Sequence, residues 1–110
     1  MTFEQFSRTV RGDRLPPLLL LQSEESYYLD EAVRLTSALV PHESRDFNLT
    51  VVHGRDLKGA ELIDQARTLP VFTDRRVIII KTINEAPAEQ LEIFSGYLDD
   101  PVPETQLLIT

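Results

Sequence analysis

Residues 62–81 read LIDQARTLPVFTDRRVIIIK. The first part has the apolar spacing of a helix, and Pro70 ends that pattern. Four consecutive β-branched residues at positions 77–80 then predict a strand that is buried on both faces, as in a parallel sheet covered by helices. The connection between helix and strand holds an apolar pair, Val71 and Phe72, although connections normally face solvent. These two side chains therefore either pack into the domain or contact a partner.

Outward from this stretch, strands alternate with helices. Apolar runs predict strands at 18–21, 46–53, 76–81 and 106–110. Helical spacing predicts helices at 26–40, at 60–69 and after Pro87, and the Thr2-x-x-Gln5 capping box predicts a short helix before the first strand. This alternation predicts an α/β fold with a parallel sheet of about four strands flanked by helices.

The composition limits the class of protein. The chain has 110 residues, of which 42% are apolar and 26% charged, as expected for a single globular domain over residues 1–110. Cysteine is absent, which excludes disulfides and thiolate metal sites. The formal net charge of -7 argues against direct binding to nucleic acid. The sequence has neither an apolar run long enough for a bilayer nor a signal peptide, so we expect a cytoplasmic protein without a membrane partner.

The strand ends lack the residues of a nucleotide site. In open α/β sheets, ligands bind beyond the carboxyl ends of the strands. The first such loop, residues 22–27, has neither the glycines nor the lysine that cradle phosphates, and Glu24 and Glu25 would repel them. Lys81 ends the third strand, where an NTPase would hold an acidic residue for magnesium. We therefore predict that the domain has no catalytic residue, no cofactor and no metal.

Two other classes of protein remain open at this point. A divergent P-loop NTPase would share the predicted topology. A receiver domain would use acidic residues such as Glu24 and Glu25 with Lys81, but it also needs a phosphorylatable aspartate at a strand end, where this chain has His53 or Lys81.

Three segments together resemble the delta subunit of the bacterial DNA polymerase III clamp loader. They are EESYYL at 24–29 after the leucine-rich strand, RDFN at 45–48, and ARTLPVFTDRRVIIIK at 66–81. The Thr-Leu-Pro-x-Phe-x-x-x-Arg block and the Arg-Asp-Phe-Asn segment are each weak signals, but fairly specific in combination. In that family this region is the first domain, a RecA-like AAA+ fold that has lost its nucleotide site. By analogy with AAA+ domains, the resemblance implies the sheet order 2-3-4-1, with the first strand at an edge.

The resemblance implies a mechanical role. The family's subunit binds the ring-shaped sliding clamp (beta) and opens one of its interfaces for loading onto primed DNA. It works with the delta-prime and gamma/tau subunits of the DNA polymerase III holoenzyme, and this domain would meet DNA only indirectly. The family's clamp contact falls here on Leu69, Val71 and Phe72, and Pro70 would shape the connection between helix and strand that carries them. The family's lid and collar domains would follow Thr110.

The alternative for these residues is structural, because Leu69, Val71 and Phe72 could cap the core beneath the third helix. Leu69 is in phase with that helix, so we expect it to be the most buried of the three. Burying each such side chain is worth about 1.5–3 kcal/mol, whereas association costs about 4–15 kcal/mol. Further contacts must therefore contribute, and we expect a dissociation constant on the order of 10⁻⁶ M. Arg75 and Arg76 could steer binding or could simply be solvated charges.

Overall fold

A computed structural model describes residues 2–11, 16–71 and 75–110. It contains a four-stranded sheet in the order β1-β4-β3-β2, in which all neighbours are parallel. The predicted α/β class, the parallel sheet and the strand order are thus confirmed, with β1 at one edge and β2 at the other. The strands are β1 (Leu18–Leu20), β2 (Leu49–His53), β3 (Arg76–Lys81) and β4 (Thr105–Ile109).

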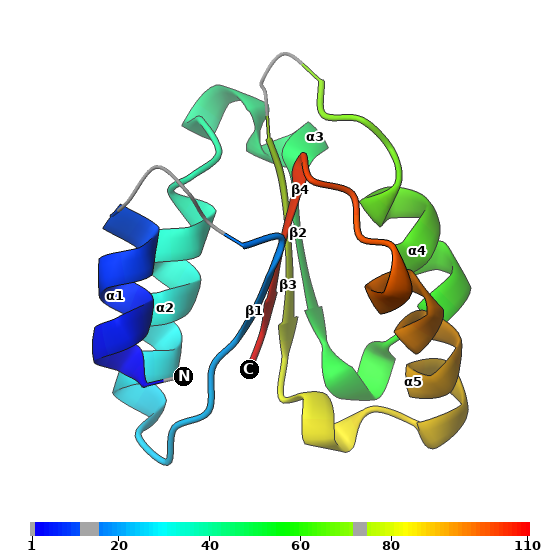
Figure 1. The fold of residues 1–110 in the computed structure, drawn as a ribbon, viewed down its shortest axis with the longest axis horizontal. Helices are drawn as coiled ribbons and strands as arrows, with labels where there is room; N and C mark the ends of the chain where they lie inside the picture. Colours follow the sequence, from blue (N-terminus) through cyan, green and yellow to red (C-terminus); the bar gives the residue numbers. More distant parts are fainter. Residues whose placement is uncertain (1, 12–15, 72–74) are drawn as a thin grey trace.

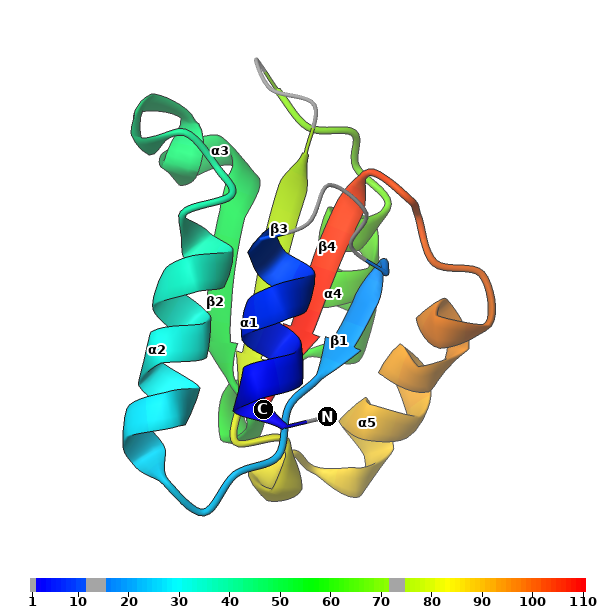
Figure 2. The same ribbon diagram turned by 60° about the vertical axis from the view of Figure 1, so that its left-hand side comes forward.

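Helices cover both faces of the sheet (Figures 1 and 2). One face carries α1 (Phe3–Arg11) and α2 (Ser26–Ser37), and the other carries α4 (Gly59–Ala66) and α5 (Ala88–Ser95). The short helix α3 (Arg45–Asn48) lies directly before β2, at the end of the sheet where β3 begins.

The strand β3 packs against the helices on both faces of the sheet, as the apolar run at residues 77–80 predicted. All four of these side chains are fully buried. Ile78 and Ile80 pack in the cluster with α4 and α5, whereas Val77 and Ile79 pack in the cluster with α1 and α2. The alternation follows from the period of two in a strand, and burial on both faces explains why the run is continuously apolar.

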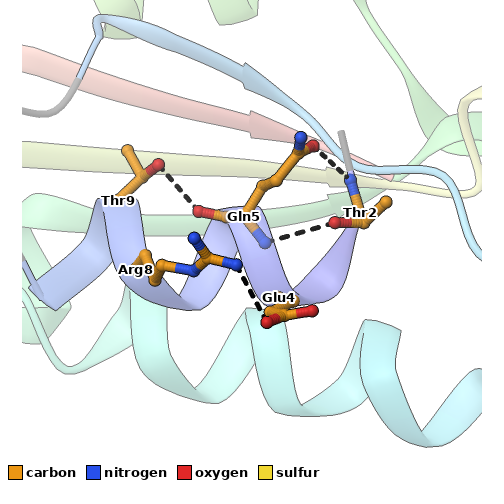
Figure 3. A network of polar contacts seen from close by, with 5 residues as sticks. All are labelled: Thr2, Glu4, Gln5, Arg8 and Thr9. Atoms are coloured by element: carbon orange, nitrogen blue, oxygen red, sulfur yellow. Dashed lines mark hydrogen bonds and ion pairs between the residues drawn. The ribbon is translucent and has the colours of Figure 1, made fainter.

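The capping box at the start of α1 is confirmed (Figure 3). The backbone N–H of Thr2 donates to Gln5 Oε1 over 3.0 Å, and the backbone N–H of Gln5 donates to Thr2 Oγ1 over 3.2 Å. These bonds satisfy donors that a helix start leaves open, and they orient α1 so that Phe6 is fully buried against the sheet.

Three predicted element bounds were wrong by three residues each. The helix predicted at 26–40 is α2, which ends at Ser37. The second strand begins at Leu49, not at position 46, because residues 45–48 form the helical turn α3. The third helix ends at Ala66 rather than at position 69, and Arg67 is its C-cap. The differences in the second strand and the third helix have the same cause, since residues 47–48 and 68–71 are held by side-chain contacts with each other and with Arg76 of β3, described below.

For the last helix, the spacing of Leu91, Phe94 and Leu98 predicts one apolar face, and this prediction was partly wrong. Phe94 and Tyr97 are buried, whereas Leu91 and Leu98 are more than a third exposed. The chain changes from an α-helix to a 3-10 turn at Gly96, which rotates the following residues relative to the predicted helical spacing. The consequence is that Tyr97 rather than Leu98 faces the core.

Among the described residues, no helix is both long enough and apolar enough to cross a membrane.

Candidate functional site

The described part of the predicted contact, residues 69–71, lies in the connection from α4 to β3, at the end of the sheet where β2 and β3 begin (Figure 1). Leu69 is 65% exposed and Val71 is 38% exposed, while Pro70 between them is half-buried. Phe72, the fourth predicted residue, lies outside the described residues. We call residues 69–71 the apolar tip. The expectation that Leu69 would be the most buried was wrong, because α4 ends three residues earlier and Leu69 is no longer in phase with it.

The backbone of the tip is held by Asn48, a fully buried side chain of α3. Asn48 Oδ1 accepts from the backbone N–H of Val71 over 2.7 Å, and Asn48 Nδ2 donates to the carbonyl of Val71 over 2.5 Å. The side-chain amide therefore pairs with Val71 in both directions, as a neighbouring strand would. Asn48 Nδ2 also lies 3.3 Å from the carbonyl of Ser44, so α3 and the tip share one side chain.

A second buried group, Arg76, binds both segments at the start of β3. Its guanidinium donates to the carbonyls of Thr68 over 3.0 Å, of Phe47 over 2.9 Å and of Leu69 over 3.4 Å. Arg76 is only 7% exposed, so the prediction of a solvated or steering charge was wrong for this residue. The planar guanidinium fixes the relative directions of its donors, which holds three carbonyls in one arrangement.

Two of the three sequence segments that carried the resemblance therefore meet in space. Asn48 is the last residue of RDFN, and Arg76 is the arginine of the Thr-Leu-Pro-x-Phe-x-x-x-Arg block. Reasoning from the sequence missed both residues as parts of the site, because it assigned Asn48 to a strand and Arg76 to the solvent. In each case the local signal was only a polar residue directly before the first apolar residue of a strand, and the partners lie outside the local pattern.

The opposite end of the sheet, at the carboxyl ends of the strands, contains a cleft of about 570 Å³. Its lining comes from the segments that follow β1 and β3 and from the end of β4, including Gln22, Ser23, Glu24, Thr82, Asn84 and Thr110. Of the lining side chains that the structure describes, Glu24 is the charged one. The cleft is thus at the position expected for a ligand in an open α/β sheet, but its lining has no cation to bind a phosphate.

The loops around the cleft are closely packed. A Cβ added to Gly54 would lie 2.2 Å from the carbonyl oxygen of Thr82, so only glycine lets these two loops approach. Thr82 itself has φ 57° and ψ 57°, a left-handed conformation that is unfavourable for a β-branched residue. His53 Nε2 lies 3.3 Å from Glu85 Oε2 across the same loops.

Titratable groups give no further candidate site. The described residues include no group of three or more side chains suited to hold a metal ion. The hydrogen bond from Arg34 lowers the pKa of Glu31 below its usual value, but this pair lies on α2 and contributes to neither end of the sheet.

Comparisons with known proteins agree on one family. The family model described as DNA polymerase III, delta subunit matches residues 20–110. The DNA polymerase III subunit delta of Bacillus subtilis (strain 168) is 28% identical over 118 residues, which cover 99% of this chain and 34% of that protein. The solved structure of the Bacillus subtilis DNA clamp loader delta protein matches 97% of this chain and 34% of its own, with a TM-score of 0.85 and 24% identity.

The chain thus spans about a third of the length of both relatives. The structural match establishes a shared fold, and the match to the family model over most of the sequence establishes the family. This chain belongs to the DNA polymerase III delta subunit family.

Proposed function

We propose that this chain binds the sliding clamp through the apolar tip and helps to open the ring for loading onto primed DNA. One observation supports this proposal above the others: exposed apolar side chains stand on a backbone that two buried polar side chains hold in place. A loop that is already ordered loses little conformational entropy on binding, so more of the contact energy is available for affinity. Phe72 is included in the proposed contact on the basis of the sequence.

The rest of the proposal concerns the longer subunit. Residues 1–110 would form its RecA-like first domain, and the other clamp-loader subunits, delta prime and gamma/tau, would be bound through the full-length chain. DNA would be reached only indirectly, consistent with the net charge of -7. The domain itself would be non-catalytic, with a nucleotide site that has lost the groups for phosphate and magnesium.

Binding to immobilised cognate sliding clamp tests the proposed contact. We expect Leu69→Ala to weaken binding about tenfold, because it removes a large part of the exposed apolar area of the tip, and Val71→Ala and Phe72→Ala to weaken it less or equally. The melting temperature of Leu69→Ala should stay close to that of the unmodified chain. Leu91→Ala, a leucine of α5 that is 38% exposed, is the matched control and should bind normally. Unchanged binding by all three of the variants Leu69→Ala, Val71→Ala and Phe72→Ala would contradict the proposal.

A divergent P-loop NTPase is the second candidate, because the cleft lies where such a protein binds its nucleotide. Calorimetric titration with ATP and magnesium distinguishes the two functions. The lack of a cation in the described lining predicts no saturable binding up to millimolar nucleotide. Saturable binding at micromolar nucleotide would favour the enzyme.

A further inference from the structure

Phe47 is a large exposed aromatic residue beside the apolar tip that the proposed function does not yet use. It belongs to the four-residue helix α3, and 58% of it is exposed, whereas the next residue, Asn48, is fully buried. The exposed ring leaves a large apolar area beside the tip that a partner could bury, and burial of an aromatic ring is strongly favourable.

The backbone of Phe47 is tied to the tip by the guanidinium of Arg76. Arg76 Nη1 donates to the carbonyl of Phe47 over 2.9 Å, and Nη2 of the same group donates to the carbonyl of Leu69 over 3.4 Å. Because one rigid planar group makes both bonds, residues 47 and 69 keep a fixed relative position. The adjacent pair of Asn48 with Val71 makes the same connection one residue further along α3.

We propose that Phe47 is a further contact residue of the same surface, so that Phe47, Leu69 and Val71 together meet an apolar pocket on the sliding clamp. This inference rests on the proposed function. The three residues come from two segments that are more than twenty positions apart in the sequence but share the same supporting side chains. Phe47 therefore supplies part of the additional contact area that the tip alone lacks.

The surroundings of Phe47 favour a protein partner over a nucleic acid. An exposed aromatic ring that stacks on a base normally works beside cations that bind the phosphates. The guanidinium nearest to the Phe47 backbone is 7% exposed and is already bound to three backbone carbonyls, so it is not offered to a phosphate. The chain as a whole carries a net charge of -7.

The test measures the dissociation constant of the 110-residue chain for the cognate sliding clamp by surface plasmon resonance. It compares the unmodified chain with the variants Phe47→Ala, Phe47→Leu and Tyr27→Ala. We expect Phe47→Ala to weaken binding about fivefold or more, because it removes a large aromatic contact from the surface. Phe47→Leu should recover part of that loss, because it restores apolar area. Tyr27→Ala is the matched control, since Tyr27 is an aromatic residue of α2 that is 67% exposed, and its binding should not change.

The outcomes separate this inference from the proposed function. If Leu69→Ala weakens binding while Phe47→Ala binds as the unmodified chain does, Phe47 is not a contact and the inference is wrong, but the proposed function stands. If Phe47→Ala weakens binding only together with a large fall in melting temperature, and Phe47→Leu shows the same fall, Phe47 is structural and the inference is also wrong. If neither the tip variants nor Phe47→Ala changes binding, both proposals are wrong.

Discussion

The two ends of the parallel sheet differ in what their side chains do. The carboxyl end has the cleft that this type of sheet offers to ligands, but its described lining includes one charged side chain, Glu24. The amino end contains a buried arginine and a buried asparagine, both bound to backbone groups of exposed segments. The comparison teaches that, in this domain, buried polar groups hold exposed segments in place at the end opposite to the usual ligand site, which is where we propose the contact surface.

The largest expected effect is at the amino end. Arg76→Met should reduce the free energy of unfolding by at least about 3 kcal/mol, because it leaves three carbonyls without their charged donor. Urea unfolding measures this loss. Arg8→Ala, which breaks an exposed ion pair with Glu4, is the control and should change the stability by less than about 0.5 kcal/mol. Equal effects of the two substitutions would mean that Arg76 does not organise the amino end.

A smaller loss is expected at the carboxyl end from Gly54→Ala. The new Cβ would lie 2.2 Å from the carbonyl oxygen of Thr82, so the loops must separate, at a cost of about 2 kcal/mol. Gly96→Ala is the matched control, because a Cβ there meets nothing within 4 Å. Thermal unfolding should show a lower melting temperature for the first variant and an equal or higher one for the second. A normal melting temperature for Gly54→Ala would show that the cleft loops are not closely packed.

The smallest effect expected is a gain in stability at the same end. Thr82→Asn should raise the free energy of unfolding by about 1 kcal/mol, because asparagine tolerates a left-handed backbone better than a β-branched residue does. Chemical denaturation measures the change, with Thr50→Asn on β2 as a comparison in which no gain is expected. A loss in Thr82→Asn would mean that the threonine side chain has a stabilising contact that outweighs the backbone strain.

How much of the fold and of the site could be predicted from the sequence depends on how far apart in the sequence the interacting residues lie. The burial of residues 77–80 and the capping box of Thr2 depend on short-range periodicity or spacing, and both were confirmed. The strand order was also confirmed, but it came by analogy with the resembled fold.

The polar support of the tip was not predicted, because its partners are far apart in the sequence. Asn48 and Val71 are separated by 23 positions, and no local pattern distinguishes a buried asparagine of this kind from a polar residue in a strand. The exposure of Leu69 was missed for the same reason, since the end of α4 at Ala66 coincides with contacts that hold residues 68 and 69 to Arg76.

The most direct test of this account compares the two ends of the sheet in one binding measurement. The dissociation constant for the cognate sliding clamp is determined for the Leu69→Ala/Val71→Ala double variant and for Asn84→Ala, which changes the lining of the cleft. The account predicts that the double variant binds more than about tenfold more weakly, while Asn84→Ala stays within about twofold of the unmodified chain. Normal binding by the double variant, with a loss in Asn84→Ala, would contradict it.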